Sequence, residues 1–149
     1  MGAVELILSI DLLPEPPPHV LVYCIESTIT LEALNILSFS SNTPVIGTNL
    51  QINANVKNRG LLAANSYSVS FYDDYNDDGN PTPNELINTV NSSSPLPPGD
   101  SINYNTSKLM DSLGTRQFIA VVNYSADEDT SNNKKVGTVN VISGGGGFD

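Results

Sequence analysis

The chain has 149 residues, enough for one domain with extensions, and 39% of them are hydrophobic, enough to build a core. Sixteen acidic residues against six lysines and arginines give a net charge of −10, which excludes binding that depends on neutralising nucleic-acid phosphates and argues against adhesion to anionic lipid. Only 15% of the residues are charged, and asparagine, serine and threonine take their place, which favours strands and turns over helices.

The first 32 residues differ in pattern from the rest of the chain. Two apolar runs, Val4–Ile10 and Val20–Ile25, flank a group of prolines, which fits two short strands joined by a stiff turn. This extension pairs with the main sheet, belongs to a preceding module or was added to the natural chain, and the sequence does not choose among these. It holds Cys24, which has no intrachain disulfide partner, and His19, which has no acid or nucleophile nearby in sequence.

From Leu34 onward, short runs with alternating apolar residues are separated by clusters of glycine, proline, asparagine and aspartate, as in antiparallel sandwiches. This pattern predicts an all-β, immunoglobulin-like antiparallel β-sandwich of about seven strands. The expected strands are Leu34–Phe39, Asn49–Val56, Ser66–Tyr72, Glu85–Val90, Ser101–Thr106, Arg116–Tyr124 and Lys134–Ile142. The last two contain the most continuous apolar runs, so we expect them to be the best buried.

Domain boundaries follow from these patterns. We expect an extension over residues 1–32, the sandwich over 33–143 and a glycine linker over 144–149, because a run of four glycines is a flexible tether. No stretch approaches the ~18 apolar residues of a membrane span, and Met1–Ile10 lacks the basic flank of a signal peptide. The chain is therefore interpreted as a module of a longer polypeptide, without membrane insertion.

Three phrases of the sequence carry a family resemblance. They are Val56-Lys57-Asn58-Arg59-Gly60, Pro98-Gly99-Asp100-Ser101 and Asp127-Glu128-Asp129-Thr130-Ser131-Asn132-Asn133. In this order and spacing, the chain from about Leu34 to Ile142 resembles the CARDB family, the cell-adhesion-related domain of bacteria. The resemblance implies an immunoglobulin-like sandwich without general catalytic residues, repeated as modules in secreted or surface-anchored proteins. The acidic insertion after Tyr72 departs from the family pattern.

That insertion contains the sharpest chemical motif of the chain. Residues 74–85 match the calcium-loop pattern D-x-[DN]-x-[DN]-G-x5-E at every fixed position. Oxygen-bearing side chains at alternate positions can converge on one hard cation if the chain curls around it, and Gly79 permits the sharp reversal. The expected calcium ligands are Asp74, Asn76, Asp78, the carbonyl of Asn80 and Glu85, with Thr82 contributing directly or through water.

The setting of this loop differs from a helical calcium-binding hand, because the loop follows an expected strand and contains Pro81 and Pro83. It is similar to hand-like loops that lack both helices in extracellular modules. The alternative is an acidic hairpin connection built from turn-forming residues. Five carboxylates within residues 73–85 favour a bound counter-ion, since their mutual repulsion would destabilise an empty fixed loop.

Weaker signals have simpler explanations. The acidic group Asp127–Asp129 with Asn132 and Asn133 is compatible with a second cation site, but such clusters between strands are ordinarily solvated turns. Tyrosines in strands are more often core or cross-strand partners than a binding platform. The four in question are Tyr67, Tyr72, Tyr104 and Tyr124.

The sequence therefore predicts a non-catalytic, extracellular structural or adhesion module, secreted or anchored to a cell surface, that binds a stabilising calcium ion. Its expected partners are neighbouring modules of the same polypeptide, with a protein or carbohydrate ligand also possible. The alternative is a carbohydrate- or peptide-binding accessory module of a secreted hydrolase, in which exposed tyrosines would form the contact surface. The single His and single Cys, both in the extension, give no arrangement for nucleophilic catalysis.

Overall fold

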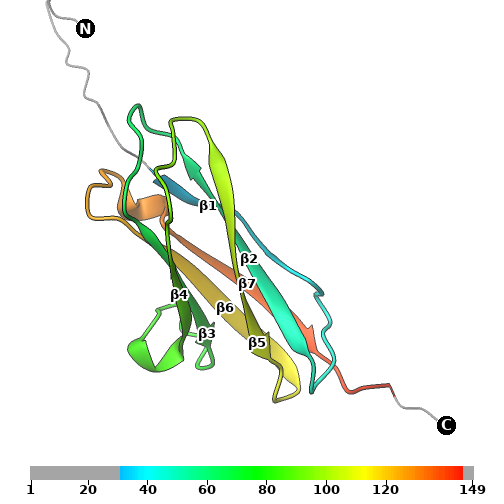
Figure 1. The fold of residues 1–149 in the computed structure, drawn as a ribbon. Coiled ribbons are helices and arrows are strands. Elements are labelled where there is room, and N and C mark those ends of the chain that lie inside the picture. Colours follow the sequence, from blue (N-terminus) through cyan, green and yellow to red (C-terminus); the bar gives the residue numbers. More distant parts are fainter. Residues whose placement is uncertain (1–30, 146–149) are drawn as a thin grey trace, which may run out of the picture.

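The computed structural model describes residues 31–145, and Figure 1 shows their arrangement. The expectations for residues 1–30, including Cys24 and His19, and for residues 146–149 lie outside the described residues. Seven strands are present: β1 (Leu31–Phe39), β2 (Asn49–Asn58), β3 (Ser68–Asp74), β4 (Leu86–Asn91), β5 (Ser101–Leu109), β6 (Gly114–Asn123) and β7 (Lys134–Val141). Two short 3₁₀ turns, η1 (Pro83–Glu85) and η2 (Thr130–Asn132), complete the described elements.

The strands form two antiparallel sheets that face each other. One sheet has the order β1-β2-β5 and the other has the order β4-β3-β6-β7. This arrangement confirms the predicted all-β immunoglobulin-like sandwich of about seven strands. None of the helical turns in the described part of the chain has the length or apolar character needed to cross a bilayer.

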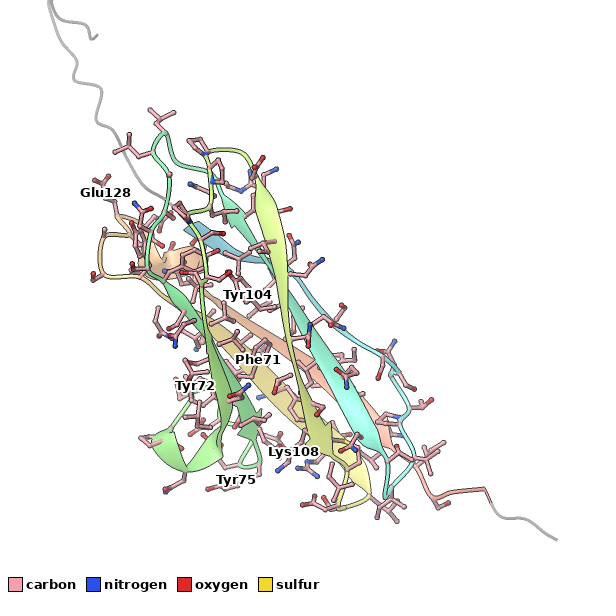
Figure 2. All side chains as sticks on the ribbon, in the orientation of Figure 1. Phe71, Tyr72, Tyr75, Tyr104, Lys108 and Glu128 are labelled. Carbon is pink, nitrogen blue, oxygen red and sulfur yellow. The ribbon has the colours of Figure 1, made fainter. Side chains whose placement is uncertain are left out.

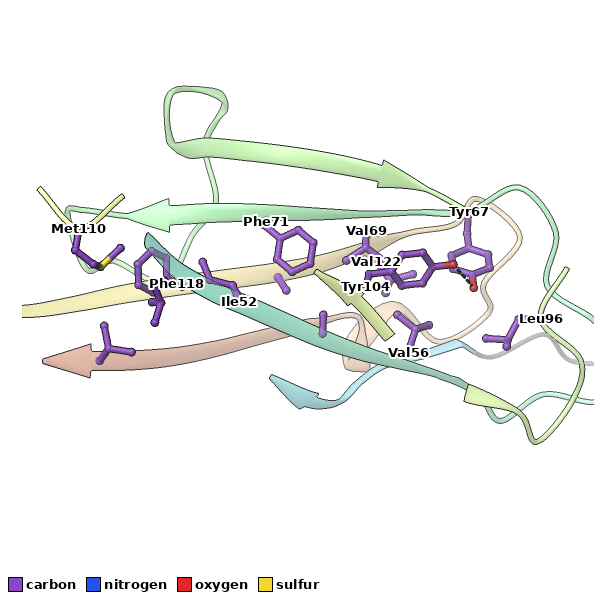
Figure 3. Close-up of a cluster of buried hydrophobic side chains, with 14 of the residues drawn as sticks. Ile52, Val56, Tyr67, Val69, Phe71, Leu96, Tyr104, Met110, Phe118 and Val122 are labelled. Carbon is purple, nitrogen blue, oxygen red and sulfur yellow. Dashed lines mark hydrogen bonds between the residues drawn. The ribbon is translucent and has the colours of Figure 1, made fainter. Parts of the chain in front are cut away.

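The core lies between the sheets and follows from the alternation of each strand. In β2, the apolar residues from Leu50 to Val56 are buried while Gln51 faces solvent. In the facing sheet, Phe71 of β3 and Phe118 of β6 are fully buried (Figure 3). Burial of large apolar side chains from both sheets is the dominant favourable contribution to folding.

Several strand bounds and one burial pattern differ from the sequence-based expectation; β1, for example, begins at Leu31 and not at Leu34. Strand β5 continues to Leu109, three residues beyond the expected end, because its backbone pairs with β2 as far as Asn49. Strand β7 was expected to be among the best buried, and this is wrong. It lies at the edge of the four-stranded sheet, where only Val139 and Val141 are buried and Val136 is 42% exposed. A continuous apolar run did not distinguish this edge strand from a central one.

Candidate metal-binding loop

The candidate calcium loop, residues 74–85, connects β3 to β4 at the lower end of these strands in Figure 1. Its first residue, Asp74, pairs with Gln117 of β6. Further along, the carbonyl of Gly79 accepts a 2.7 Å hydrogen bond from Nζ of Lys134, the first residue of β7. Lys134 pairs with Val121, well inside the sheet, so the loop folds back toward β7.

The loop lies on the solvent side of its sheet. Successive side chains of β3 point to opposite faces of the sheet. Phe71 and Asp73 point inward, so Asp74 points to the outer face, as Tyr72 does. Ile119 of β6, which pairs with Tyr72, also faces outward, yet it is only 1% exposed and is not part of the central core cluster. A small second buried region therefore exists on the outer face beside the loop.

Asp74 is fully buried at the base of the loop. Its Oδ1 accepts the N–H of Asp78 at 3.2 Å, and its Oδ2 accepts the N–H of Gly79 at 2.8 Å and Nε2 of Gln117 at 2.5 Å. Burial by itself would raise the pKa of Asp74, but hydrogen bonds from Gln117, Gly79, Asp78 and Asp77 outweigh it and lower the pKa below its ordinary value. Asp74 is thus held as a carboxylate.

The middle of the loop is a chain of hydrogen bonds between positions two residues apart. Oδ1 of Asn76 accepts the N–H of Asp78 at 3.0 Å, and Oδ1 of Asp78 accepts the N–H of Asn80 at 2.7 Å. Positive φ angles at Asp77 and Gly79 reverse the chain here, a conformation that glycine adopts without steric cost. The three polar side chains are exposed, so they are free to exchange water for a cation.

Glu85 closes the loop at the end of η1. Its Oε2 accepts hydrogen bonds from the N–H of Thr82 at 2.9 Å and from the Thr82 hydroxyl at 2.8 Å. The residue is only 3% exposed, and its other oxygen, Oε1, is buried without any hydrogen-bond partner. A buried carboxylate oxygen without a partner is costly, and a cation or a trapped water would relieve that cost.

The structure assembles the loop only in part. Asp74, Asn76, Asp78 and Asn80 are linked by hydrogen bonds, whereas Glu85 bonds only to Thr82. Within residues 31–145, no three acidic, histidine or cysteine side chains come close enough to hold a metal ion. Both oxygens of Asp74 accept N–H groups, but a carboxylate has about four acceptor positions, so coordination capacity remains. The ligand set named from the sequence thus stays a prediction.

Sequence reasoning missed the two residues that anchor the loop from outside, Gln117 and Lys134. No local motif marks them, and only the pairing of β3, β6 and β7 brings them to the loop. The sequence-based argument that five carboxylates would repel one another in an empty loop is also weaker than expected. Asp73 points to the opposite face of the sheet, where Arg116 donates a short hydrogen bond to it and Lys108 lies at 3.5 Å.

These charged residues line an open cleft of about 440 Å³ at the same end of the sandwich. Arg116 also donates a 2.8 Å hydrogen bond to Oδ1 of Asp111, and this bond lowers the pKa of Asp111. Because Lys108 belongs to β5 and Asp73 to β3, the charges connect the two sheets where the core ends (Figure 2). The cluster closes the end of the core with paired charges.

The four strand tyrosines considered as a binding platform do not form an exposed surface. Tyr67 and Tyr104 are buried, at 2% and 8% exposure, and their rings meet edge to face. Tyr124 is half-buried against Tyr67, and Tyr72 is half-buried on the outer face. A sugar-stacking surface needs aromatic rings presented together, so this arrangement argues against the carbohydrate-binding alternative.

Comparison with solved structures shows the same fold in other proteins. The CARDB domain of a Pyrococcus furiosus protein, in complex with di-metal ions, matches with a TM-score of 0.66 and 14% identity, over 81% of this chain and 100% of that chain. A domain of a candidate cell surface protein from Methanosarcina acetivorans matches with a TM-score of 0.58 and 18% identity, over 76% of this chain and 93% of that one. These identities establish the fold alone.

An enzyme also contains a similar sandwich. A β-glucosidase from Listeria innocua, in complex with glucose, matches with a TM-score of 0.53 and 15% identity over 78% of this chain, but the match covers only 16% of the enzyme. Comparison with curated protein sequences finds no significant match. The CARDB family model matches residues 31–137, which is most of the chain and includes the three phrases noted in the sequence. The chain therefore belongs to the CARDB family.

Proposed function

We propose that this CARDB domain is a non-catalytic, extracellular structural or adhesion module of a larger secreted or surface protein, and that its loop 74–85 binds a stabilising calcium ion. The observation that carries the calcium proposal is the buried, unpartnered Oε1 of Glu85 at the end of a loop whose first ligand, Asp74, is a buried carboxylate. An oxygen that lacks a donor is available to a cation.

The chemistry of the donor set fits a hard cation. Ca²⁺ takes six to eight oxygen ligands from carboxylates, amide and backbone carbonyls and water. Asp74, Asn76, Asp78 and Glu85 would supply side-chain oxygens and Asn80 its carbonyl, with water completing the shell. The loop would then have to draw Glu85 toward Asp74, a small closure that the exposed positions 76–80 permit. The Pyrococcus relative, which binds di-metal ions, lends support at the level of the family.

Two observations support the structural role: the proteins in which similar domains occur, and the burial of the strand tyrosines. A structural neighbour of this chain is a domain of a candidate cell surface protein, and an enzyme that shares the fold carries it as a small part of its length. The tyrosines that an accessory carbohydrate-binding module would present are largely buried here. We therefore favour a spacer whose partners are neighbouring modules of the same polypeptide over a ligand-binding attachment to a hydrolase.

Thermal unfolding with and without calcium tests this function. We expect a dissociation constant of roughly 10⁻⁴–10⁻³ M, as in extracellular modules. Free Ca²⁺ at about 10 to 100 times this dissociation constant should then stabilise the fold by about 1.4–2.7 kcal/mol. Asp78→Ala should abolish this rise in Tm, because it removes the oxygen ligand at an exposed position where the core is not disturbed. Mg²⁺ should substitute poorly, since it needs near-octahedral geometry and releases water reluctantly.

Asp77→Asn is the matched control. It removes the same charge one residue away, at a position that is not a ligand, and asparagine tolerates the positive φ of Asp77. A rise in Tm that survives Asp78→Ala, or that is equally lost with Asp77→Asn, would refute the specific loop. A melting curve indifferent to both millimolar Ca²⁺ and EDTA would leave a spacer without calcium. Hydrolytic turnover that disappears when one carboxylate is changed would contradict the non-catalytic role.

A further inference from the structure

The connection between β6 and β7 contains a second acidic segment, Asp127–Asn133. The next residue, Lys134, bonds through its side chain to the carbonyl of Gly79 in the candidate loop. Asp74 pairs with Gln117 near the start of β6, whereas this segment follows the end of β6 at Asn123. The two segments therefore leave the four-stranded sheet at opposite ends, as Figure 1 shows.

Hydrogen bonds within the segment form the turn expected from its composition. Oδ1 of Asp127 accepts the N–H of Asp129 at 3.1 Å, and Oδ1 of Asp129 accepts the N–H of Ser131 at 3.2 Å. Nδ2 of Asn133 donates a 2.8 Å hydrogen bond to Oδ2 of Asp127, which closes the turn. These bonds explain the fold of the segment but not all of its polar atoms.

Two amide oxygens of the segment are left unexplained. Oδ1 of Asn132 and Oδ1 of Asn133 are both buried without a hydrogen-bond partner, and Asn133 is only 5% exposed. Buried acceptors are almost always paired, so two neighbouring exceptions call for an absent partner. Rotating the Asn133 amide does not remove the problem, because its oxygen would then face the carboxylate oxygen of Asp127.

The position of the Asn133 oxygen relative to Asp127 suits a cation. The oxygen and nitrogen of an amide are joined through one carbon by bonds of about 1.2 and 1.3 Å, so the Asn133 oxygen lies within about 5 Å of Oδ2 of Asp127. A calcium ion with ligands at about 2.3–2.6 Å spans such a separation. Asn133 also borders an open hollow of about 600 Å³, which gives an ion a path from solvent.

We propose that Asp127, Asp129, Asn132 and Asn133 form a second site for Ca²⁺, independent of loop 74–85. Two carboxylates and two amide oxygens are the ligand types that a hard cation selects. The ion is the partner that the two buried amide oxygens lack, and it offsets the repulsion between the neighbouring acids. The ion holds the β6–β7 connection closed by bridging Asp127 and Asn133.

Native mass spectrometry and calorimetric titration with Ca²⁺ test the site. The wild-type chain should bind two ions, Asp78→Ala should bind one, and the double variant Asp78→Ala with Asp129→Ala should bind none. Circular dichroism in EDTA checks that every variant is folded.

Two further variants separate a ligand from a turn residue. Glu128→Gln removes a neighbouring charge that is not a ligand, and the affinity should change less than threefold. Asn132→Asp adds a carboxylate to the site and should tighten Ca²⁺ binding about tenfold while lowering stability in EDTA. A merely structural turn would show the loss of stability without the gain in affinity, which would overturn the proposal.

The failures of the two sites are distinguishable. If Asp78→Ala removes no ion but Asp129→Ala removes one, the loop proposal fails and this site stands. If Asp78→Ala removes all bound calcium, or if a second ion is unaffected by Asp129→Ala, this site is refuted and the loop proposal is untouched.

Discussion

The hydroxyl of Tyr104 donates a 2.8 Å hydrogen bond to the hydroxyl of Tyr67, and this buried contact joins the two sheets (Figure 3). Tyr104 lies in β5 of the three-stranded sheet, while Tyr67 immediately precedes β3 of the other. Burial, and then the hydrogen bond and charge interaction with Tyr104, raise the pKa of Tyr67. Tyr67 therefore remains a neutral hydrogen-bonding group at physiological pH.

The pair predicts a non-additive double-mutant cycle. Tyr67→Phe alone leaves the Tyr104 hydroxyl buried without its acceptor, and Tyr104→Phe alone removes the donor to Tyr67, so each should cost about 1–3 kcal/mol. Changing both residues to phenylalanine removes both polar groups, and the cost should be clearly less than the sum. Urea unfolding measures the three free energies. Strict additivity would mean that the bond does not couple the sheets.

The strands were predictable because their signal is local, but the contacts between them were not. Gln51 and Asn53 alternate with buried apolar residues in β2, and this alternation alone places one face inward. That Tyr67 meets Tyr104, or that Gln117 meets Asp74, depends on which strands pair and in which register. Those facts arise from the whole fold.

In the candidate loop too, local contacts were predictable from the sequence and contacts with distant strands were not. Its motif is contiguous, so the hydrogen bonds that Asp74 accepts from Asp78 and that Asp78 accepts from Asn80 follow from local spacing. The ion pairing of Asp73 with Arg116 and the anchoring of Gly79 by Lys134 come from strands far along the chain. The five acids were therefore counted as one cluster, although the sheet separates Asp73 from the rest.

Acid should weaken the structure around the loop through Asp74. Its folded pKa lies below the ordinary value of 3.8, so its contribution to stability is complete above that value and is lost as the pH falls through the folded pKa. Gln117→Leu removes one donor while Asp74 remains buried, which should raise the folded pKa and lower stability at pH 5. The difference in stability from wild type should narrow as the pH falls, because the contribution of the Asp74 charge is lost once Asp74 is protonated in both proteins.

Urea unfolding between pH 5 and pH 2 measures this narrowing. Asn123→Ala is the control, since Asn123 also faces outward from β6 but donates to Ser68 and Ser70 and to no carboxylate. Its cost should not depend on pH in this range. A Gln117→Leu difference that stays constant over the whole range would show that the hydrogen bond does not hold the Asp74 charge.

The charged cluster at the end of the core predicts unequal effects of its two cations. Arg116 is 10% exposed and pairs with a buried Asp73, so Arg116→Met leaves an uncompensated buried charge and should cost about 3–5 kcal/mol. Lys108 is 31% exposed and lies at 3.5 Å from the same carboxylate, so Lys108→Met should cost about 1 kcal/mol or less. Equal losses in chemical denaturation would contradict the assignment of Arg116 as the main partner.

Gly137 of β7 lies against two side chains of β1. A Cβ atom added at this position would lie 2.9 Å from Cε2 and Cζ of Phe39 and 3.2 Å from Cδ2 of Leu37. Phe39 in turn packs against Phe118, with ring centroids 5.8 Å apart. The ring cannot move aside without disturbing the core, so Gly137→Ala should destabilise the domain by about 1–3 kcal/mol.

The loss of stability in Gly137→Ala should arise from a steric clash with Phe39, and a second substitution at Phe39 tests this. Leucine is smaller than phenylalanine, so Phe39→Leu should cost less in the Gly137→Ala background than in the wild type, because it removes the ring that the new methyl group strikes. Gly145→Ala is the control for adding a methyl group, since nothing lies within 4 Å of its Cβ, and it should change stability by about 0.5 kcal/mol or less. If Gly137→Ala melts like the wild type, then Phe39 yields freely, and β7 is not held tightly against β1.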